Sequence, residues 1–296
     1  MNFDFAVAGG YFAGWRIVRA LPEKFAYKTF EKIGQYALLR NGTSVKRLRS
    51  NLSRVCPTYS SSEMDELMRS AMSSYMRYWC DTFRSPDWSR ERIAATVTVD
   101  GEDLLTTPMT NGTGVVVSLP HAGNWDHAGS YFCGMGFPLV TVAERLKPEA
   151  LFNKFLEYRQ NIGMEVLSLD SRSIVTLLQR AREGRLIALV ADRDLSKSGV
   201  DVSFFGHPAR MPAGPALLAI RTGIPLITAY VSYTPTGIHI VFTSVEIPTT
   251  GSEEERVSQV VQRCADLFAR GIASSPQDWH MLQRIWIDGD FQERSA

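Results

Sequence analysis

The chain has 296 residues, of which 45% are hydrophobic and 21% are charged, with 32 Lys and Arg against 31 Asp and Glu. This composition is typical of a globular protein and excludes disordered, collagen-like and disulfide-scaffold proteins. The four cysteines lie too far apart in sequence for a zinc ribbon or a disulfide framework, and the longest uncharged stretches are broken by Gly, Pro and Thr. We therefore expect a reducing cytosolic compartment, no transmembrane helix and, from residues 1–22, no signal peptide.

The charge is unevenly distributed along the chain. Residues 1–54 carry ten Lys and Arg against three Asp and Glu, a net charge of +7, whereas the remaining 22 Lys and Arg and 28 Asp and Glu give −6. Residues 5–18 add aromatic and aliphatic side chains, a composition typical of a helix at a membrane interface. We expect an anionic membrane surface as partner, with an amphipathic helix packed on the core as the alternative. Nucleic acid is disfavoured, because the aromatic residues do not alternate with the later basic run at residues 46–49.

A second helix is predicted to begin after Ser60. Three serines followed by Glu63 resemble a capped amino terminus, and apolar residues then recur at spacings of three and four until Pro86. This Met and aromatic stripe is explained by packing against the core or a membrane. We therefore divide the chain into a helical, membrane-associating region over residues 1–89 and an α/β core over residues 90–296.

From Gly114 onward, short apolar runs alternate with helical stretches. Strands are predicted at 115–119, 139–143, 165–169, 186–191 and 225–232, and helices near 126–134, 148–162, 172–183 and 212–222. Gly163, Gly184 and Gly223 stand where the last three helices should end. This order predicts an α/β fold with a mainly parallel sheet covered by helices on both faces. A turn at 234–237 adds an antiparallel strand over 238–244, and an amphipathic helix follows over 257–272.

Polar residues follow each predicted strand, at the sheet edge where ligands bind in parallel α/β folds. They are His121, Asn124 and Asp126 after the first strand, Glu144 and Arg145 after the second, Asp170 and Arg172 after the third, and Asp192, Arg193 and Asp194 after the fourth. A histidine among carboxylates and arginines is typical of a catalytic site for a polar or phosphorylated substrate.

His121 and Asp126 are the most specific candidate for a catalytic pair close together in sequence, because Gly123 allows a turn between the strand and the next helix. A carboxylate bonded to one ring nitrogen fixes the tautomer, so the other nitrogen can take a proton from a hydroxyl. A loop histidine that caps a helix is the structural alternative.

Two other function classes stay open. His121, Asp126 and His127, completed by Asp192 or Asp194, could ligate the metal of a hydrolase acting on a phosphorylated lipid or sugar. Because adjacent residues point in different directions from a helix start, we expect no metal. The sequence lacks a dinucleotide fingerprint, a P-loop and a Gly-x-Ser-x-Gly elbow, so we also expect no bound cofactor. A lipid-binding or scaffolding protein is the non-enzymatic alternative.

Several blocks in order resemble one family over nearly the whole chain. They are Leu119-Pro-His-Ala-Gly-Asn-Trp-Asp126, Thr141-Val-Ala-Glu-Arg-Leu-Lys-Pro-Glu149, Glu157-Tyr-Arg159, Asp192-Arg-Asp194, Phe204-Phe-Gly206, Arg210-Met-Pro-Ala-Gly-Pro-Ala216 and Asp278-Trp-His-Met-Leu-Gln283. They resemble the lipid A acyltransferase superfamily, and among its members the actinobacterial phosphatidylinositol mannoside acyltransferases.

The resemblance implies a peripheral enzyme on the cytoplasmic face of the plasma membrane. It would move a palmitoyl chain from acyl-CoA, a co-substrate rather than a cofactor, onto a mannose hydroxyl of phosphatidylinositol mannoside. A lipid A-type (Kdo-lipid) acceptor is the alternative, and we expect a monomer.

The same resemblance suggests roles for individual residues. His121 would be the general base and Asp126 would orient it. The family's second acidic residue, a glutamate in mannoside acyltransferases and an aspartate in lipid A enzymes, falls on Asp192. Glu144 and Arg159 look like an ion pair near the donor and Ser198 like a donor contact, although a surface charge and a turn would also explain Arg159 and Ser198.

Overall fold

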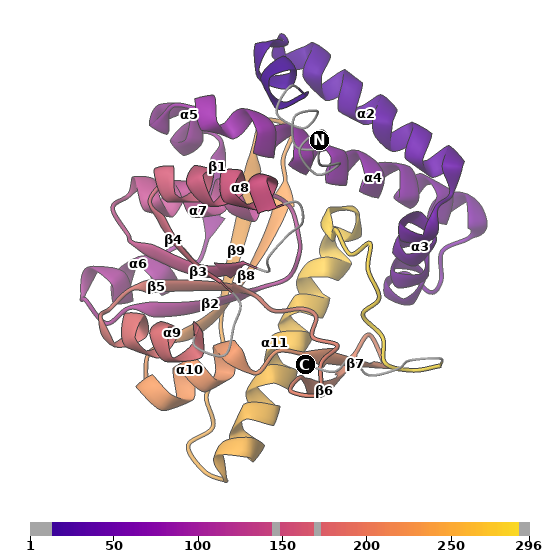
Figure 1. The fold of residues 1–296 in the computed structure, drawn as a ribbon. Coiled ribbons are helices and arrows are strands. Elements are labelled where there is room, and N and C mark those ends of the chain that lie inside the picture. The colour runs from indigo at the N-terminus through magenta and orange to yellow at the C-terminus, as the bar shows by residue number, and fades with distance from the viewer. Residues whose placement is uncertain (1–13, 144–148, 169–172, 290–296) are drawn as a thin grey trace.

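A seven-stranded sheet with helices on both faces forms the centre of the molecule (Figure 1). The computed structural model describes residues 14–143, 149–168 and 173–289. The sheet contains β1 (Val97–Asp100), β2 (Val115–Leu119), β3 (Leu139–Ala143), β4 (Met164–Ser168), β5 (Leu186–Val190), β8 (Leu226–Tyr233) and β9 (Ile238–Ser244). Their order is β1-β9-β8-β2-β5-β3-β4, and only the β8–β9 pair is antiparallel. The mainly parallel α/β prediction is therefore confirmed.

The helices are α2 (Glu23–Arg40), α3 (Thr43–Val55), α4 (Ser61–Arg84), α5 (Arg90–Ala95), α6 (Asp103–Thr110), α7 (Trp125–Gly134), α8 (Glu149–Asn161), α9 (Ser173–Arg182), α10 (Gly214–Thr222) and α11 (Glu253–Ser274). Alternating side chains of β2 explain how both faces are covered. Val115 and Val117 pack into a cluster with α6 and α7, whereas Val116 packs into a second cluster with α10 and α11.

Most predicted elements of the sheet match the structure. The limits of β2, β3 and β9 agree with the prediction, and Gly223 ends α10 in the left-handed conformation, with φ of 74°. α2 and α3 were expected only as part of a helical region over residues 1–89, and the elements missed altogether were α5, β1, α6 and a separate hairpin of β6 (Val200–Phe204) and β7 (His207–Met211). These are short, and β1 is an edge strand without a fully buried residue, so their apolar patterns are weak.

The helices before residue 90 pack against the end of this core. The predicted amino terminus of α4 is confirmed, because Ser60 and Glu63 form a capping box. α2 lies along α4, and Gly34 permits the close approach, since a Cβ there would lie 2.9 Å from Cγ of Met76. α3 and α4 also supply Leu48 and Leu67 to the same cluster as Val116 of the sheet.

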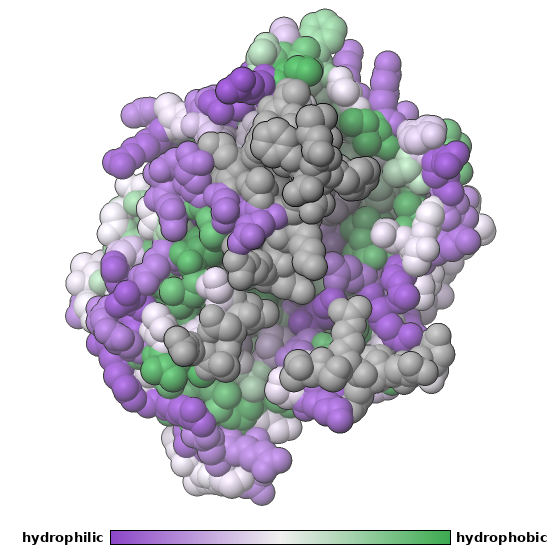
Figure 2. All heavy atoms as spheres, viewed as in Figure 1, coloured by the Kyte–Doolittle hydropathy of each residue, from purple (hydrophilic) through white to green (hydrophobic). Residues whose placement is uncertain are grey.

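The described helices include none long and apolar enough to cross a membrane. Several large hydrophobic side chains are nevertheless exposed on α2: Phe25, Ile33, Tyr36 and Leu39. Figure 2 shows hydrophobic residues reaching the surface among hydrophilic ones on the side where α2 lies.

Replacing Asn51 with Ala should destabilise the fold by roughly 2–4 kcal/mol, because each buried polar group left unpaired costs about 1–3 kcal/mol. Asn51 is 2% exposed; its amide donates to the carbonyls of Met281 (2.7 Å) and Gln283 (3.0 Å) and accepts from the indole of Trp286 (2.9 Å). Urea unfolding measures the change. Gln160→Ala, an exposed amide on α8, is the control and should shift stability by less than about 0.5 kcal/mol. Equal stability of both variants would contradict this anchoring role.

Candidate active site

A histidine and a buried carboxylate meet at the carboxyl ends of two neighbouring strands. His121 follows β2 and Asp192 follows β5, and these parallel strands pair Leu119 with Val190. Nδ1 of His121 lies 2.6 Å from Oδ1 of Asp192, and the backbone N–H of His121 donates to Oδ2 at 3.0 Å. The Asp192 side chain is fully buried, whereas that of His121 is 41% exposed. The pair thus faces solvent through the imidazole alone.

Trp279 provides a further donor to this carboxylate. Its indole Nε1 donates to Oδ2 of Asp192 at 2.9 Å, and the tryptophan is fully buried. Burial alone would raise the pKa of Asp192, but the His121 ring and the three hydrogen bonds outweigh it, and the pKa lies below its usual range. The carboxylate is therefore charged at neutral pH. It accepts a hydrogen bond from Nδ1 of His121, so Nδ1 carries a proton and Nε2 is the ring nitrogen that can act on a hydroxyl.

The segment carrying Trp279 is bonded to the His121 loop along its backbone. Gly123 donates to the carbonyl of Asp278 at 2.8 Å, and His280 donates to the carbonyl of His121 at 2.7 Å. Gly123 has φ of 56°, and a Cβ there would lie 2.5 Å from the carbonyl oxygen of Val231. A glycine is needed at this turn for both reasons.

A second buried network fixes the same segment to α4. The Ser74 hydroxyl donates to Oδ1 of Asp278 at 2.6 Å, so it accepts the 2.9 Å bond from Nε2 of His280. The other carboxylate oxygen of Asp278 accepts from the backbone N–H of Tyr233 at 3.0 Å. Burial lowers the pKa of His280 to about 3, with the nearby His121 adding to the effect, so this second imidazole stays neutral.

Asp126 does not hold the imidazole, contrary to the expectation from the sequence. Its carboxylate accepts from Arg159 at 2.8 and 3.1 Å and from the Tyr78 hydroxyl at 3.3 Å. Asp126 lies in the first turn of α7 and faces α4 and α8, whereas the partner of His121 comes from the adjacent strand end. The predicted closeness of the two strand ends is thus confirmed, but the assignment of the orienting carboxylate to Asp126 was wrong.

The other expected site residues are placed in different ways. Glu144, together with Arg145, Asp170 and Arg172, lies outside the described residues. Arg159 is 19% exposed and paired with Asp126. Ser198 lies in an exposed turn between β5 and β6, where its hydroxyl is 2.8 Å from that of Ser196.

The residues of the metal alternative are spread apart. His127 is buried with Nε2 3.2 Å from the Thr96 hydroxyl, and burial lowers its pKa to about 4. Asp194 accepts from the backbone of Ser196 at 2.8 Å. Within the described ranges, no three His, Cys, Asp or Glu side chains converge as ligands for one ion.

Sequence reasoning missed the contributions of Trp279 and Ser74. Trp279 belongs to a block noted for its resemblance, but nothing in its spacing relates it to Asp192, 87 positions away. Ser74 lies among the apolar residues of α4, and its burial is the signal that identifies it as a polar partner.

Two buried tryptophans allow the Asp192 contact to be tested. Trp279→Phe removes a donor to a carboxylate, and we expect a loss of roughly 1.5–3 kcal/mol at pH 6. Because folding lowers the pKa of Asp192, the charged carboxylate stabilises the fold above its unfolded-state pKa of about 3.9, and this stabilisation is lost as pH falls through its folded-state pKa. Loss of the indole donor raises the folded-state pKa of Asp192. The stability deficit of Trp279→Phe, measured by urea unfolding, should therefore shrink between pH 6 and pH 3.5.

The matched control is Trp286→Phe, which removes a 2.9 Å bond to the amide of Asn51. Its deficit should not vary over the same pH interval, because an amide does not titrate. A Trp279→Phe deficit that is equally independent of pH would show that the indole does not stabilise the Asp192 charge.

Comparison with known proteins agrees with the resemblance seen in the sequence. The bacterial lipid A biosynthesis acyltransferase family matches residues 6–287. The chain is 42% identical over 290 residues to a protein of Mycolicibacterium smegmatis (strain ATCC 700084 / mc(2)155) named phosphatidylinositol mannoside acyltransferase, covering 97% of this chain and 93% of that protein. It is 39% identical over 292 residues to a protein of the same name from Mycobacterium tuberculosis (strain CDC 1551 / Oshkosh), covering 97% and 90%. The chain therefore belongs to the bacterial lipid A biosynthesis acyltransferase family.

Proposed function

We propose that this acyltransferase moves a palmitoyl chain from acyl-CoA to a mannose hydroxyl of a phosphatidylinositol mannoside. The names of the relatives support the acceptor. The observation that carries the chemistry is the bond between Nδ1 of His121 and the buried carboxylate of Asp192, which leaves Nε2 free to act on a hydroxyl.

The proposed reaction is a direct transfer between two substrates. Nε2 of His121 takes the proton of the mannose hydroxyl while its oxygen attacks the thioester carbonyl, and Asp192 stabilises the imidazolium. The tetrahedral intermediate then collapses, the carbon–sulfur bond breaks, and the CoA thiolate recovers the proton from Nε2. General base catalysis supplies about 10²- to 10⁴-fold, so positioning of both substrates must supply the rest.

On the donor side, the proposal keeps Arg159, Glu144 and Ser198 as contacts of acyl-CoA. Arg159 is held by a bidentate ion pair to the buried Asp126 beside α7. Such a pair fixes the guanidinium plane. The part of Asp126 in this proposal is therefore to position Arg159 and not the imidazole.

The proposed location is the cytoplasmic face of the plasma membrane, with α2 against the lipid. Phe25, Tyr36 and Leu39 are 65%, 61% and 84% exposed, and helical spacing places Lys28 and Lys32 on the same outward side. Apolar side chains beside lysines are typical of a helix that lies in an anionic interface. Each nearby basic residue contributes about 1 kcal/mol to attraction by such a surface.

Replacing His121 with Ala should lower acyl transfer by about 10²- to 10⁴-fold, because the general base is lost. Release of CoA thiol from palmitoyl-CoA, dependent on a mannosylated acceptor, measures the rate, and mass spectrometry of the product identifies the acceptor. His207→Ala, at a histidine that is 42% exposed on β7, is the matched control and should stay near wild type. A normal rate in the His121→Ala enzyme would contradict the proposed general base. Transfer to a Kdo-lipid alone would show that the acceptor is a lipid A-type molecule and not a phosphatidylinositol mannoside.

Replacing Phe25 and Leu39 together with Ser should weaken binding to anionic vesicles by at least about tenfold, because two large apolar side chains no longer enter the interface. Vesicle co-sedimentation at fixed salt measures the affinity. Val175→Ser on α9 removes another exposed apolar residue, 67% exposed, and should leave binding unchanged. Equal vesicle binding by wild type, the Phe25/Leu39 double variant and Val175→Ser would contradict the role of α2 in membrane binding.

A further inference from the structure

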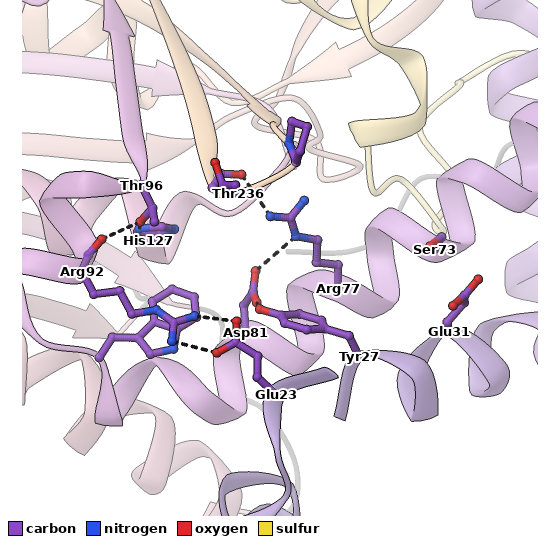
Figure 3. Close-up of a pocket in the computed structure, with 13 residues that line it drawn as sticks. Glu23, Tyr27, Glu31, Ser73, Arg77, Asp81, Arg92, Thr96, His127 and Thr236 are labelled. Carbon is purple, nitrogen blue, oxygen red and sulfur yellow. Dashed lines mark hydrogen bonds and ion pairs between the residues drawn. The ribbon is translucent and has the colours of Figure 1, made fainter. Parts of the chain in front are cut away.

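Two adjoining cavities lie between α2, α4 and the turn that joins β8 to β9. Figure 3 shows the larger of the two. Their volumes are about 650 and 550 Å³, and both are lined by Glu31, Ser73, Arg77 and Pro235. Each falls in the range of about 300–1,000 Å³ that is typical of small-molecule sites. We refer to the two together as the α2–α4 groove. Of the site residues considered from the sequence, His127 of the metal alternative lines it, whereas His121, Asp126, Asp192, Arg159 and Ser198 do not.

Ion pairs and hydrogen bonds form a rigid frame around the α2–α4 groove. Arg92 makes a bidentate pair with Glu23 at 2.8 and 3.0 Å. Arg77 donates to the carbonyls of Thr234 (2.7 Å) and Gly237 (3.2 Å) and so joins α4 to the β8–β9 turn. Figure 3 shows these charged groups arranged around the cavity. Their charges are already balanced within the protein, so they shape the groove without requiring a charged ligand.

A second set of lining side chains has unused hydrogen-bonding capacity. They are Glu31, Gln35, Arg69, Ser70, Ser73, Thr236 and Gln277. Their side chains have no hydrogen-bond or ion-pair partner among the residues described. The set contains carboxylate and amide acceptors, guanidinium and amide donors, and hydroxyls that do both. The groove therefore offers donors and acceptors interspersed along its length.

This chemistry matches a neutral polyhydroxyl ligand. An acyl chain would need continuous apolar walls, but the apolar lining side chains, such as Trp88, Leu38 and Pro235, lie among charged, amide and hydroxyl groups. A strongly anionic ligand would need an excess of cations, but carboxylates and guanidinium groups alternate around the groove. Sugar and cyclitol hydroxyls both donate and accept, so they can use every kind of group present.

The α2–α4 groove also borders the His121 loop through one layer of side chains. Asp81 lines the groove and accepts from Asn124, the amino-terminal cap of α7, at 3.4 Å. Ser74 and Asp278 line its other end and bond to each other beside His280. A ligand in the groove would therefore lie next to the residues that hold the catalytic loop in place.

α2 connects the groove with the proposed membrane face. Glu23, Tyr27, Glu31 and Gln35 recur every four residues along α2 and form one stripe that lines the groove. The exposed apolar residues lie on a neighbouring face of the same helix. A headgroup that projects from a lipid layer against α2 would thus meet the groove directly.

We propose that the α2–α4 groove binds the polyhydroxyl headgroup of a membrane glycolipid, through inositol or hexose units. The headgroup has two possible sources. It belongs either to the acceptor, in which case the inference rests on the proposed function, or to a second glycolipid that is not acylated and presents the same hydroxyls.

The test fills the groove with Ser73→Leu on α4, and removes a charge with Glu31→Gln on α2. Ser258→Leu, an exposed serine on α11, is the control for adding leucine to a helix surface, and circular dichroism with thermal unfolding verifies folding. Saturation-transfer NMR with myo-inositol and with methyl α-mannoside probes direct binding. We expect signals with wild type and the control, and their loss in Ser73→Leu.

Kinetics then separates the two sources of the headgroup. If the groove holds the acceptor, both groove variants raise KM for the full glycolipid by about tenfold, the equivalent of one or two lost hydrogen bonds, but not KM for a short alkyl mannoside. If it holds a second glycolipid, added phosphatidylinositol stimulates wild type and not the variants. Unchanged NMR signals, KM values and phosphatidylinositol response in folded Ser73→Leu would overturn the inference. Absence of acyl transfer by wild type would refute the proposed function, while the NMR result would still decide the groove.

Discussion

A charged carboxylate with no exposed surface is the constraint on which this structure depends. Asp192 is stable there only because a ring nitrogen, a backbone N–H and an indole N–H all face it. These donors come from the end of β2 and from a segment near the carboxyl terminus. The strand order must therefore place the end of β2 beside the end of β5, and the segment that carries Trp279 must bring its indole within hydrogen-bond distance of Asp192.

The same constraint explains how the helices before residue 90 become part of the site. The segment that carries Trp279 is held from the other side by Ser74 of α4, and Asn51 of α3 bonds to the carbonyls that follow it. Residues from the beginning, middle and end of the chain thus support one imidazole. Because α2 packs along α4, the proposed membrane helix is coupled to the reacting group by packing and not by a flexible linker.

The sequence predicted the sheet well because its buried strands are continuous apolar runs bounded by glycine and polar residues. It also placed His121 and Asp192 at one sheet edge, since parallel strands end together. It assigned the wrong carboxylate because separation along the chain does not reveal which way a side chain at the start of α7 faces. The donor Trp279 and the α2–α4 groove depend on contacts between distant segments, which no local pattern encodes.

The backbone of His121 uses both of its polar groups, since its N–H donates to Asp192 and its carbonyl accepts from His280. The imidazole is thus preorganised before any substrate arrives, so orienting the base adds little to the activation free energy. One evolutionary consequence concerns chain length. A single residue inserted between Asp278 and His280 would move the indole of Trp279 away from Asp192. We therefore expect this stretch to tolerate some substitutions but no insertion.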